Sequence, residues 1–324
     1  MLLVRTIAWD TEGETVRVVV TGGAGFIGGN LVRALLARDE VDSVVAVDDL
    51  STGSKDNLQG VDVTFLEGSV TDPDVLDAAL TGADTVVHLA ALPSVPRSID
   101  DPLGSHLANA TGALQVLEAA RRAGGLHTVV ASSSSVYGAN PQMPKHEELR
   151  AEPLSPYAVT KLATEAYAAA YAHCYDLPVL PFRFFNVFGP LQPADHAYAA
   201  VVPAFVSAAL AEQPLIVHGD GQQTRDFTYV GTVSSVLADA VTRRVTSTGP
   251  VNLAFGSRVS LLELIVELET VLGHRVEVRH LDPRPGDVRA SQADDSRLRA
   301  LFPDVRPVPL RQGLEETVAW FRGI

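Results

Sequence analysis

The stretch Thr21-Gly22-Gly23-Ala24-Gly25-Phe26-Ile27-Gly28 decides the fold, because it joins a β-branched run at 16–20 to an apolar run with helical spacing at 27–37. Gly22, Gly25 and Gly28 stand three residues apart and have separate tasks. The first allows a tight turn, the second lets the backbone approach a pyrophosphate, and the third lets the helix pack closely on the strand. The free N–H groups that begin the helix suit phosphate oxygens. The stretch therefore predicts a dinucleotide site.

The residue that ends the next β-branched run distinguishes between two dinucleotides. Asp48 stands there, and Asp49 follows it with no arginine beside the pair. A carboxylate at this point accepts hydrogen bonds from the ribose hydroxyls of NAD and repels the 2′-phosphate of NADP. The sequence therefore predicts NAD as the cofactor.

Short β-branched runs alternate with longer Ala- and Leu-rich runs through the first half of the chain. We expect strands at 16–20, 44–47, 63–66, 85–89, 128–132 and 179–184, and helices at 27–37, 73–80, 105–123 and 157–175. Continuously apolar strands that alternate with helices predict an α/β fold, a doubly wound parallel Rossmann sheet covered on both faces.

Prolines punctuate the chain after about Phe185, and the regular alternation is lost. This change predicts a smaller, interleaved C-terminal lobe over the carboxyl ends of the strands, where open α/β sheets bind ligands. We therefore expect an N-terminal extension at 1–15, an NAD-binding domain at 16–185 that regains a strand near 251–255, and a nucleotide-sugar-binding lobe mainly at 186–324.

Composition excludes several classes of partner. The 324 residues carry a formal net charge of −14, which disfavours nucleic acid and anionic membranes. Cys174 is the one cysteine, so there is no internal disulfide and a reducing compartment is favoured. No apolar run approaches the length of a membrane span, and the first residues lack a basic leader. We expect a cytoplasmic protein without a metal site.

A tyrosine and a lysine stand one helical turn apart at the start of the run 157–175. Tyr157 and Lys161 therefore share one face of the expected helix, which Ser155 and Pro156 announce. A nearby ammonium stabilises a phenolate and so lowers the pKa of tyrosine, which is otherwise a poor base. Ser133 ends a buried strand and can offer a hydroxyl to a substrate oxygen beside that tyrosine. These three residues are the expected catalytic group.

Together these motifs resemble those of the extended short-chain dehydrogenase/reductases, and within them the nucleotide-sugar 4-epimerases of the UDP-galactose 4-epimerase group. The resemblance runs from about Val16 to Phe321. Its markers are TGGAGFIG, VDDLSTG, HLAA, SSSSVYG, YAVTK, RFFNVFGP, GDGQQTRDFTYV and RPGDVRAS.

The resemblance implies a role for each matching residue. Tyr157 removes the proton of the sugar 4-hydroxyl, Lys161 holds the nicotinamide ribose, and Ser133 bonds the reacting oxygen. The remaining implied cofactor contacts are Gly22, Gly25, Phe26, Ile27, Gly28, Asp48, Asp49, Leu50, Ser51, Thr52, Gly53, Leu89, Ala90, Ala91, Asn109 and Ser132. The implied substrate contacts, besides Ser133 and Tyr157, are Ser134, Asn186, Arg225, Arg284, Asp287 and Ser291.

The expected reaction is epimerisation at C4 of a UDP-hexose through a transient 4-keto sugar. In the resembling epimerases, the position that Ser291 occupies limits the room around the C2 substituent of the sugar. Serine is small, so both UDP-glucose/UDP-galactose and the N-acetylated pair are expected substrates. The family also pairs two helices of each copy in a four-helix bundle, which implies a homodimer through 105–123 and 157–175.

Other activities stay open at this point. The chain also fits a UDP-glucuronate 4-epimerase, or another nucleotide-sugar 4-keto reductase or dehydratase of the same family. Dehydratases carry Asp-Glu where this chain has Ser134-Ser135, which disfavours acid-assisted loss of water. A dinucleotide-sensing regulatory protein on the same fold is the non-enzyme alternative, but it has no need of Ser133, Tyr157 and Lys161 together.

Overall fold

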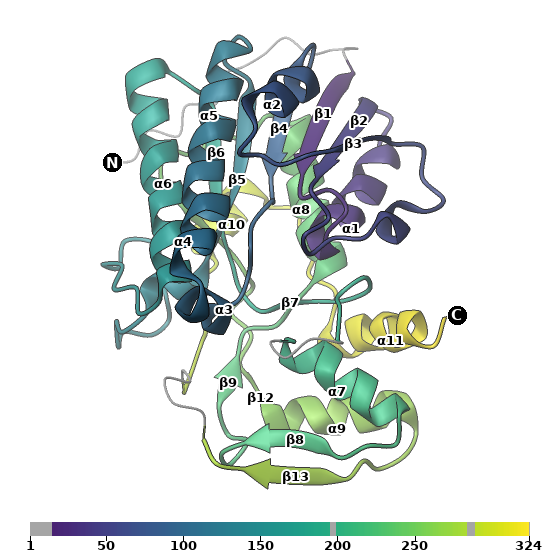
Figure 1. Cartoon of the computed structure of the whole chain (residues 1–324). Helices are drawn as coiled ribbons and strands as arrows, with labels where there is room; N and C mark the ends of the chain where they lie inside the picture. Colours follow the sequence, from purple (N-terminus) through teal and green to yellow (C-terminus); the bar gives the residue numbers. More distant parts are fainter. Residues whose placement is uncertain (1–14, 195–198, 284–288, 324) are drawn as a thin grey trace. The chain divides into compact units, whose positions relative to one another are not determined.

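A computed structural model describes residues 15–194, 199–283 and 289–323, and Figure 1 shows its ribbon. By its internal contacts the chain divides into two compact units. The first unit comprises Met1–Asn140, Glu147–Phe184 and Ser234–Val251, and the second comprises Pro141–His146, Phe185–Val233 and Asn252–Ile324. Each unit therefore contains segments from both halves of the chain.

The first unit is built on a seven-stranded sheet with the strand order β11-β6-β5-β4-β1-β2-β3. The pairs of β1 with β2 and β4, of β2 with β3, of β4 with β5 and of β5 with β6 are all parallel. The strands are β1 (Val16–Thr21), β2 (Val41–Asp48), β3 (Thr64–Glu67), β4 (Thr85–His88), β5 (His127–Ser133), β6 (Val179–Phe184) and β11 (Val251–Leu253). The predicted Rossmann sheet is confirmed, and β11 is one of its edge strands.

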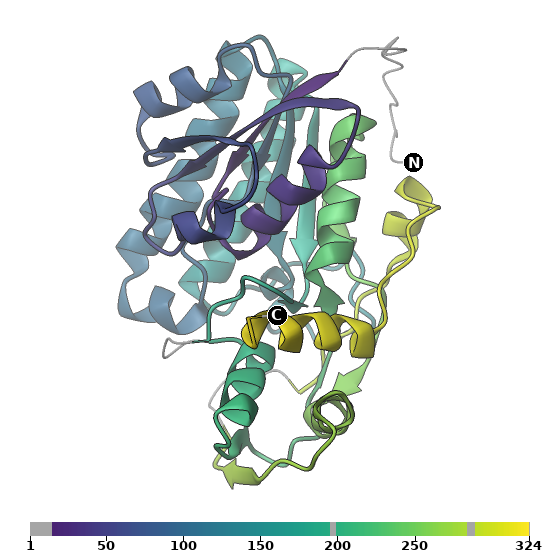
Figure 2. The ribbon, with the colours of Figure 1, turned by 90° about the vertical axis from the view of Figure 1, so that its right-hand side faces the viewer.

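Helices cover both faces of this sheet, as the two views in Figures 1 and 2 show. One face carries α2 (Pro73–Leu80), α5 (Gly112–Arg122) and α6 (Pro156–Tyr175). The other carries α1 (Phe26–Leu36) and the part of α8 (Val230–Thr242) that belongs to the first unit. Because both faces are covered, the inner strands β1, β4, β5 and β6 are buried at nearly every position.

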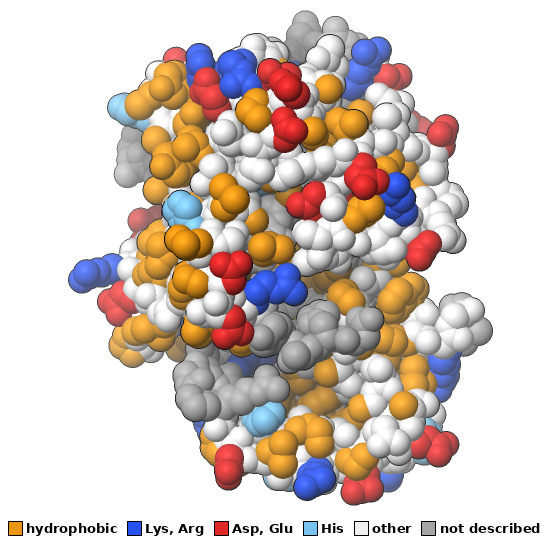
Figure 3. Space-filling model, in the orientation of Figure 1, with side chains coloured by type: hydrophobic (Ala, Val, Ile, Leu, Met, Phe, Trp, Pro, Cys, Tyr) orange, Lys and Arg blue, Asp and Glu red, His pale blue; other side chains and the backbone are white. Residues whose placement is uncertain are grey.

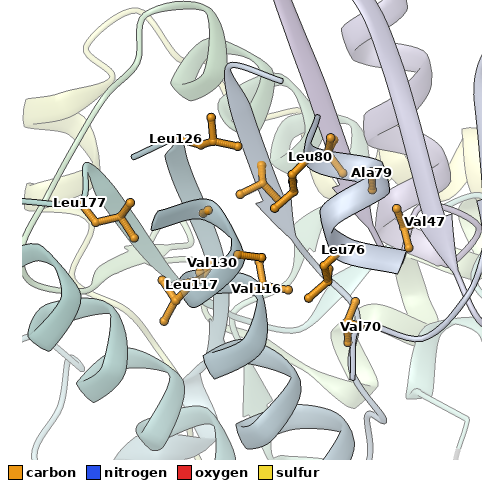
Figure 4. Close-up of a cluster of buried hydrophobic side chains, with 14 of the residues drawn as sticks. Val47, Val70, Leu76, Ala79, Leu80, Val116, Leu117, Leu126, Val130 and Leu177 are labelled. Carbon is orange, nitrogen blue, oxygen red and sulfur yellow. The ribbon is translucent and has the colours of Figure 1, made fainter. Parts of the chain in front are cut away.

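A buried apolar cluster holds α2 and α5 on the sheet (Figure 4). Leu76 and Leu80 of α2 and Leu117 of α5 are almost completely buried, and they pack with Val47 of β2 and Val130 of β5. Burying one such side chain contributes about 1.5–3 kcal/mol. The cluster therefore fixes the strands whose carboxyl ends carry the candidate site.

Helix α6 begins and ends where its sequence dictates. The Ser155 hydroxyl accepts a hydrogen bond from the Ala158 N–H at 3.2 Å, and Pro156 occupies the first turn. The helix ends at Asp176, which adopts the left-handed conformation with a φ of 53°. Tyr157 and Lys161 therefore lie within the first two turns, at a fixed place on the sheet.

The region predicted as one helix at 105–123 is divided in three. It begins earlier, as α4 (Pro102–His106), continues as the π-helical turn η2 (Leu107–Thr111) and ends as α5. A π turn holds one extra residue in the helix and often marks a functional site. Here it carries Asn109, which is almost completely buried.

The second unit consists of short elements. It contains the two-stranded sheets β10-β7, β12-β9 and β13-β8. Its strands are β7 (Val187–Phe188), β8 (Leu215–His218), β9 (Thr224–Arg225), β10 (Thr228–Tyr229), β12 (Val259–Ser260) and β13 (Val278–Leu281). Its helices are α7 (Val201–Leu210), α9 (Leu261–Leu272), α10 (Ser296–Leu301) and α11 (Leu310–Phe321). Among the described residues of the whole chain, no helix combines the length and the apolar character that crossing a membrane requires.

Two histidines buried in the first unit predict how stability responds to acid. Desolvation, with the charge of Lys161, lowers the pKa of His88 to about 3. Desolvation also lowers the pKa of His127 to about 4, although its Nε2 lies 2.8 Å from the Val245 carbonyl oxygen. Below about pH 6.5 the unfolded chain takes up these two protons and the folded chain does not, so stability falls as the pH falls toward about 4.

We expect the free energy of unfolding to drop by about 2 kcal/mol between about pH 6 and pH 5, since each proton contributes about 1.4 kcal/mol per pH unit. Urea unfolding across this range measures the slope. His127→Gln should halve the slope, whereas His274→Gln, at an exposed position, should leave it unchanged. Equal slopes in all three proteins would contradict the assignment.

Candidate active site

The turn between β1 and α1 has no room for side chains at its glycines. Gly22 has a φ of +70°, and a Cβ there would lie 2.7 Å from the Ala90 nitrogen. A Cβ on Gly28 would lie 2.0 Å from the Gly22 carbonyl oxygen. Gly25 caps α1 without a side-chain hydrogen bond, so the N–H groups that follow are presented to a ligand. The turn fits the pyrophosphate of NAD.

Asp48 ends β2 directly beside this turn. Its Oδ2 accepts from the Ala24 N–H at 3.0 Å, and its Oδ1 accepts from the Leu50 N–H at 2.9 Å. Burial raises the pKa of Asp48, against the lowering effect of these two hydrogen bonds. A Cβ on Gly53 would lie 2.9 Å from both the Ala24 backbone and the Asp48 carboxylate. The loop 49–53 is therefore held close against the glycine turn.

The segment after β4 completes this edge of the sheet. The Leu89 N–H donates to the Thr21 carbonyl oxygen at 3.0 Å, and the Ala90 N–H lies 3.4 Å from the Thr21 hydroxyl. Asn109 reaches the same segment, because its amide exchanges two hydrogen bonds with the Leu92 backbone at 2.7 and 3.1 Å. The structure thus brings together the residues predicted as cofactor contacts on the ends of β1, β2 and β4 and on the π turn.

The predicted catalytic residues also lie together, on β5 and α6. The Ser133 hydroxyl lies beside the Tyr157 hydroxyl and lowers the pKa of that tyrosine. The Lys161 ammonium donates to the Ala131 carbonyl oxygen at 2.9 Å and lies 5.9 Å from the centre of the Tyr157 ring. The Ser133 oxygen also accepts from the Ser135 N–H at 3.1 Å, which fixes the serine rotamer. A tyrosine, a serine and an ammonium therefore converge where β5 ends.

The electrostatics of this group suit proton transfer. Desolvation raises the pKa of Tyr157, and the neighbouring Ser133 hydroxyl lowers it. Desolvation lowers the pKa of Lys161 to about 8. The pKa of each group is therefore shifted from its ordinary value, as is usual for residues that exchange protons. A partner that stabilises the phenolate, such as the lysine ammonium or a cationic ring, would draw the tyrosine toward a working base.

The second unit has its own cavity, with a volume of about 400 Å³. Apolar side chains line most of the cavity, part of them from α7 and from the segment directly before it, and Asn186 and Arg225 also lie in its wall. The other lining residues are Val187, Phe188, Gln192, Ala199, Ala200, Val201, Val202, Ala204, Phe205, Ile216, His218, Gln223, Phe227 and Leu261. An apolar cavity with a few amides and one arginine suits a flat, neutral ring attached to phosphate.

A buried carboxylate fixes the loop that carries Arg225. The neighbouring Asp226 is completely buried. It accepts from the N–H groups of Gly256 and Ala293 at 3.0 Å each, and from the Ser257 hydroxyl at 2.7 Å. Two segments of the second unit, at 256–257 and at Ala293, are thus tied to the residue beside the arginine.

Other predicted substrate contacts lie elsewhere. Arg284 and Asp287 are outside the described residues. Ser291 is not one of the described residues that line the cavity, but its N–H donates to the Thr224 carbonyl oxygen at 3.1 Å, directly before Arg225. Ser134 begins the 3₁₀ turn η3 (Ser134–Tyr137), next to Ser133 in the first unit.

Two residues that surround the catalytic group were not predicted from the sequence. Glu165 and Arg183 form a buried ion pair with an N–O distance of 2.7 Å. The signal for Glu165 was its spacing, since it follows Lys161 by the same single turn that separates Lys161 from Tyr157. Arg183 stood within a recognised motif, but nothing in the sequence indicated its partner.

The Rossmann sheet, the glycine turn and the convergence of Tyr157, Lys161 and Ser133 define the class, an NAD-dependent enzyme. The chain belongs to the NAD dependent epimerase/dehydratase family, whose sequence pattern matches residues 18–254. A UDP-glucose 4-epimerase of Mycolicibacterium smegmatis is 37% identical over 319 residues, which cover 94% of this chain and 98% of that protein.

Solved structures show the same likeness. The UDP-N-acetylglucosamine 4-epimerase of Methanobrevibacter ruminantium, in complex with UDP-N-acetylmuramic acid, has a TM-score of 0.89 and 36% identity over 96% of this chain and 99% of that one. The UDP-glucuronic acid 4-epimerase of Bacillus cereus, in complex with UDP-glucuronic acid and NAD, has a TM-score of 0.87 and 31% identity over 95% of this chain and 99% of that one.

Proposed function

We propose that this protein is an NAD-dependent 4-epimerase of UDP-hexoses, with UDP-glucose and UDP-galactose and the N-acetylated pair as substrates. The observation that carries the proposal is the convergence of Ser133, Tyr157 and Lys161 where β5 ends, with the Lys161 ammonium 5.9 Å from the centre of the Tyr157 ring and 2.9 Å from the Ala131 carbonyl oxygen. The family to which the chain belongs, and the 4-epimerases among its relatives, support the same reaction.

The residues of the first unit divide the chemistry among them. When bound, NAD supplies a reversible acceptor for the hydride of the sugar C4. Tyr157 takes the proton of the 4-hydroxyl, and Ser133 holds the oxygen as it becomes a carbonyl. Lys161 favours the phenolate of Tyr157 through its positive charge. Return of the hydride to the opposite face, and of the proton from Tyr157, gives the epimer.

The cavity of the second unit is proposed to hold the nucleotide part of the substrate. Its apolar wall suits a base, and Arg225 suits a diphosphate because a guanidinium can bind two phosphate oxygens at once. Asn186 offers an amide to the ribose or the phosphates. Arg284 and Asp287 are proposed to complete this set, on the resemblance of their motif alone.

Separate incubations with UDP-glucose, UDP-N-acetylglucosamine and UDP-glucuronate test the substrate. We expect the first two to be converted to their 4-epimers without added NADH. Conversion of UDP-glucuronate alone would favour the alternative activity, a UDP-glucuronate 4-epimerase. Two relatives that are 31% identical to this chain carry that name, one of them as a probable enzyme of this kind. Stoichiometric consumption of added NADH would instead indicate a 4-keto reductase.

The small side chain of Ser291 is proposed to admit the N-acetyl group. We expect Ser291→Tyr to lower kcat/KM for UDP-N-acetylglucosamine by about 10- to 200-fold, because a ring would fill the space of the acetamide. The loss for UDP-glucose should be small. Parallel measurements of kcat/KM on the two sugars test this difference. Equal losses on both would overturn the proposed role of Ser291.

A homodimer through α4, η2, α5 and α6 is also proposed. Apolar side chains gather over α4 and α6 on the left of Figure 3. The exposed apolar residues of this surface include Leu103, with 81% of its area exposed, Leu107 and Val159. A contiguous apolar surface of this kind is typical of an interface.

We expect the unmodified protein to have the mass of a dimer by light scattering, and Val159→Asp to shift it to the monomer, because the carboxylate would be buried in the interface. Val266→Asp is the matched control, since Val266 has a similar exposure, 54% against 51%, but lies on α9 of the second unit. A monomeric unmodified protein, or a dimer that tolerates Val159→Asp, would contradict this interface.

The exposed free thiol of Cys174 supports a reducing compartment, and we propose the cytoplasm.

A further inference from the structure

Helix α6 contacts β5 through three residues at the same spacing. Tyr157, Lys161 and Glu165 follow one another at single-turn intervals and so share one face of α6. They meet three consecutive residues of β5. Lys161 donates to the Ala131 carbonyl oxygen, Glu165 accepts from the Ser132 hydroxyl, and the Tyr157 hydroxyl lies beside that of Ser133. Helix α6 packs against this strand.

Glu165, which contacts Ser132 of β5, also contacts the neighbouring strand β6. The Arg183 guanidinium makes two parallel hydrogen bonds to the Glu165 carboxylate, at 2.8 and 2.7 Å. Arg183 lies on β6, directly opposite Ser132 in the register of the two strands. Glu165 therefore binds β5 and β6 at the same level. A bidentate pair allows little sliding of the helix along the sheet.

The ion pair is enclosed on all sides. The side chains of Arg183 and Glu165 are 4% and 7% exposed. The Arg183 guanidinium lies 4.6 Å from the centre of the Tyr137 ring, and Tyr137 is itself almost completely buried. Burial lowers the pKa of Arg183, but the hydrogen bonds that Arg183 donates to the Glu165 carboxylate, together with the charge of that carboxylate, raise the pKa overall, so Arg183 remains charged. A buried charge pair of this kind is costly unless its geometry is well defined.

We propose that Glu165, through Arg183 and Ser132, is a positioning residue that sets the place of the Tyr157 hydroxyl relative to Ser133. Glu165 touches neither substrate nor cofactor in this role. It fixes the position of α6 along β5, at a point two helical turns away from Tyr157. Displacement of a catalytic group by about 1 Å can cost on the order of 10²-fold in rate, so a contact that fixes this level affects turnover directly. The inference rests on the proposed function.

The test replaces both partners at once, because removal of one leaves a buried unpaired charge. In Glu165→Met combined with Arg183→Met, flexible apolar side chains fill the space and keep contact with the Tyr137 ring. The Ser132 hydroxyl is 3.4 Å from the Lys161 carbonyl oxygen, which gives it an alternative acceptor. Replacing both members of the exposed pair Glu267–Arg311 by Met is the control.

Steady-state kinetics with UDP-glucose, NAD affinity and melting temperature are measured for each protein. We expect the buried-pair variant to keep its NAD affinity and its KM within about twofold while kcat falls by about tenfold or more. The control variant should keep both constants. A kcat within twofold of the unmodified protein, or a loss confined to KM, would overturn the proposal.

A double-mutant cycle with Ser133→Ala separates positioning from general loosening. If Glu165 acts by keeping Tyr157 against Ser133, Ser133→Ala should cost much less in the buried-pair variant than in the unmodified protein. Losses that simply multiply would overturn the proposal. If the buried-pair variant does not fold, Glu165→Gln combined with Arg183→Met takes its place in both measurements, because it also removes both charges and the bidentate contact with β6. The expected direction and the contradicting results are the same. An inactive unmodified protein would refute the proposed function instead.

Discussion

Tyr157→Phe is expected to lower kcat on UDP-glucose by on the order of 10²–10⁴-fold, the usual effect of removing a positioned acid or base. The substitution deletes only the hydroxyl, which lies beside that of Ser133. The ring remains in the first two turns of α6, so packing and the contact with Lys161 are retained. NAD affinity and melting temperature should stay close to those of the unmodified protein.

Helix α6 offers a matched control. Tyr167→Phe removes a hydroxyl from the same helix, where 40% of the tyrosine surface is exposed. This variant should keep normal turnover. Near-normal turnover in Tyr157→Phe, or equal losses in the two variants, would show that another group handles the proton of the sugar 4-hydroxyl.

Gly28→Ala is expected to weaken NAD binding by about 10- to 100-fold, since forcing an extra methyl group into a packed site costs about 1–3 kcal/mol. The added Cβ would lie 2.0 Å from the Gly22 carbonyl oxygen and 2.8 Å from the Gly23 Cα. These are backbone atoms, so the turn must open to accommodate the methyl group. The N–H groups of the turn and of α1 would then no longer point at one pyrophosphate.

Titration calorimetry with NAD measures this effect. Gly124→Ala is the control, because a Cβ there meets nothing within 4 Å although its φ of +106° makes the substitution strained. We expect Gly124→Ala to lower the melting temperature and leave NAD affinity unchanged. Unchanged NAD affinity in Gly28→Ala would contradict the assignment of the glycine turn.

Local patterns predicted the parts of the fold that depend on local chemistry. The glycine turn after Val20 and the cap formed by Ser155 are short-range features with a defined geometry, and both lie where the sequence indicated. The alternation of apolar strands with helices predicted the parallel sheet for the same reason. The π turn at Asn109 was missed, because widening one helical turn leaves no mark in the apolar periodicity.

Contacts between distant segments explain the rest of what the sequence could not predict. The cavity of the second unit draws its lining from segments as far apart as Asn186 and Leu261, with no common spacing. The partnership of Glu165 with Arg183 depends on the register of β5 and β6, which pairs Ser132 with Arg183. Single residues of these sets were visible within motifs, but their mutual distances were not.

The fate of a hydrogen label at C4 tests the central claim most directly. UDP-galactose deuterated at C4 is incubated with the protein and unlabelled water, and both epimers are analysed by mass spectrometry and NMR. If Tyr157 moves only the hydroxyl proton while the C4 hydride leaves and returns within the site, UDP-glucose should form with deuterium retained at C4. Formation of UDP-glucose without the label, or recovery of UDP-galactose alone, would contradict the account.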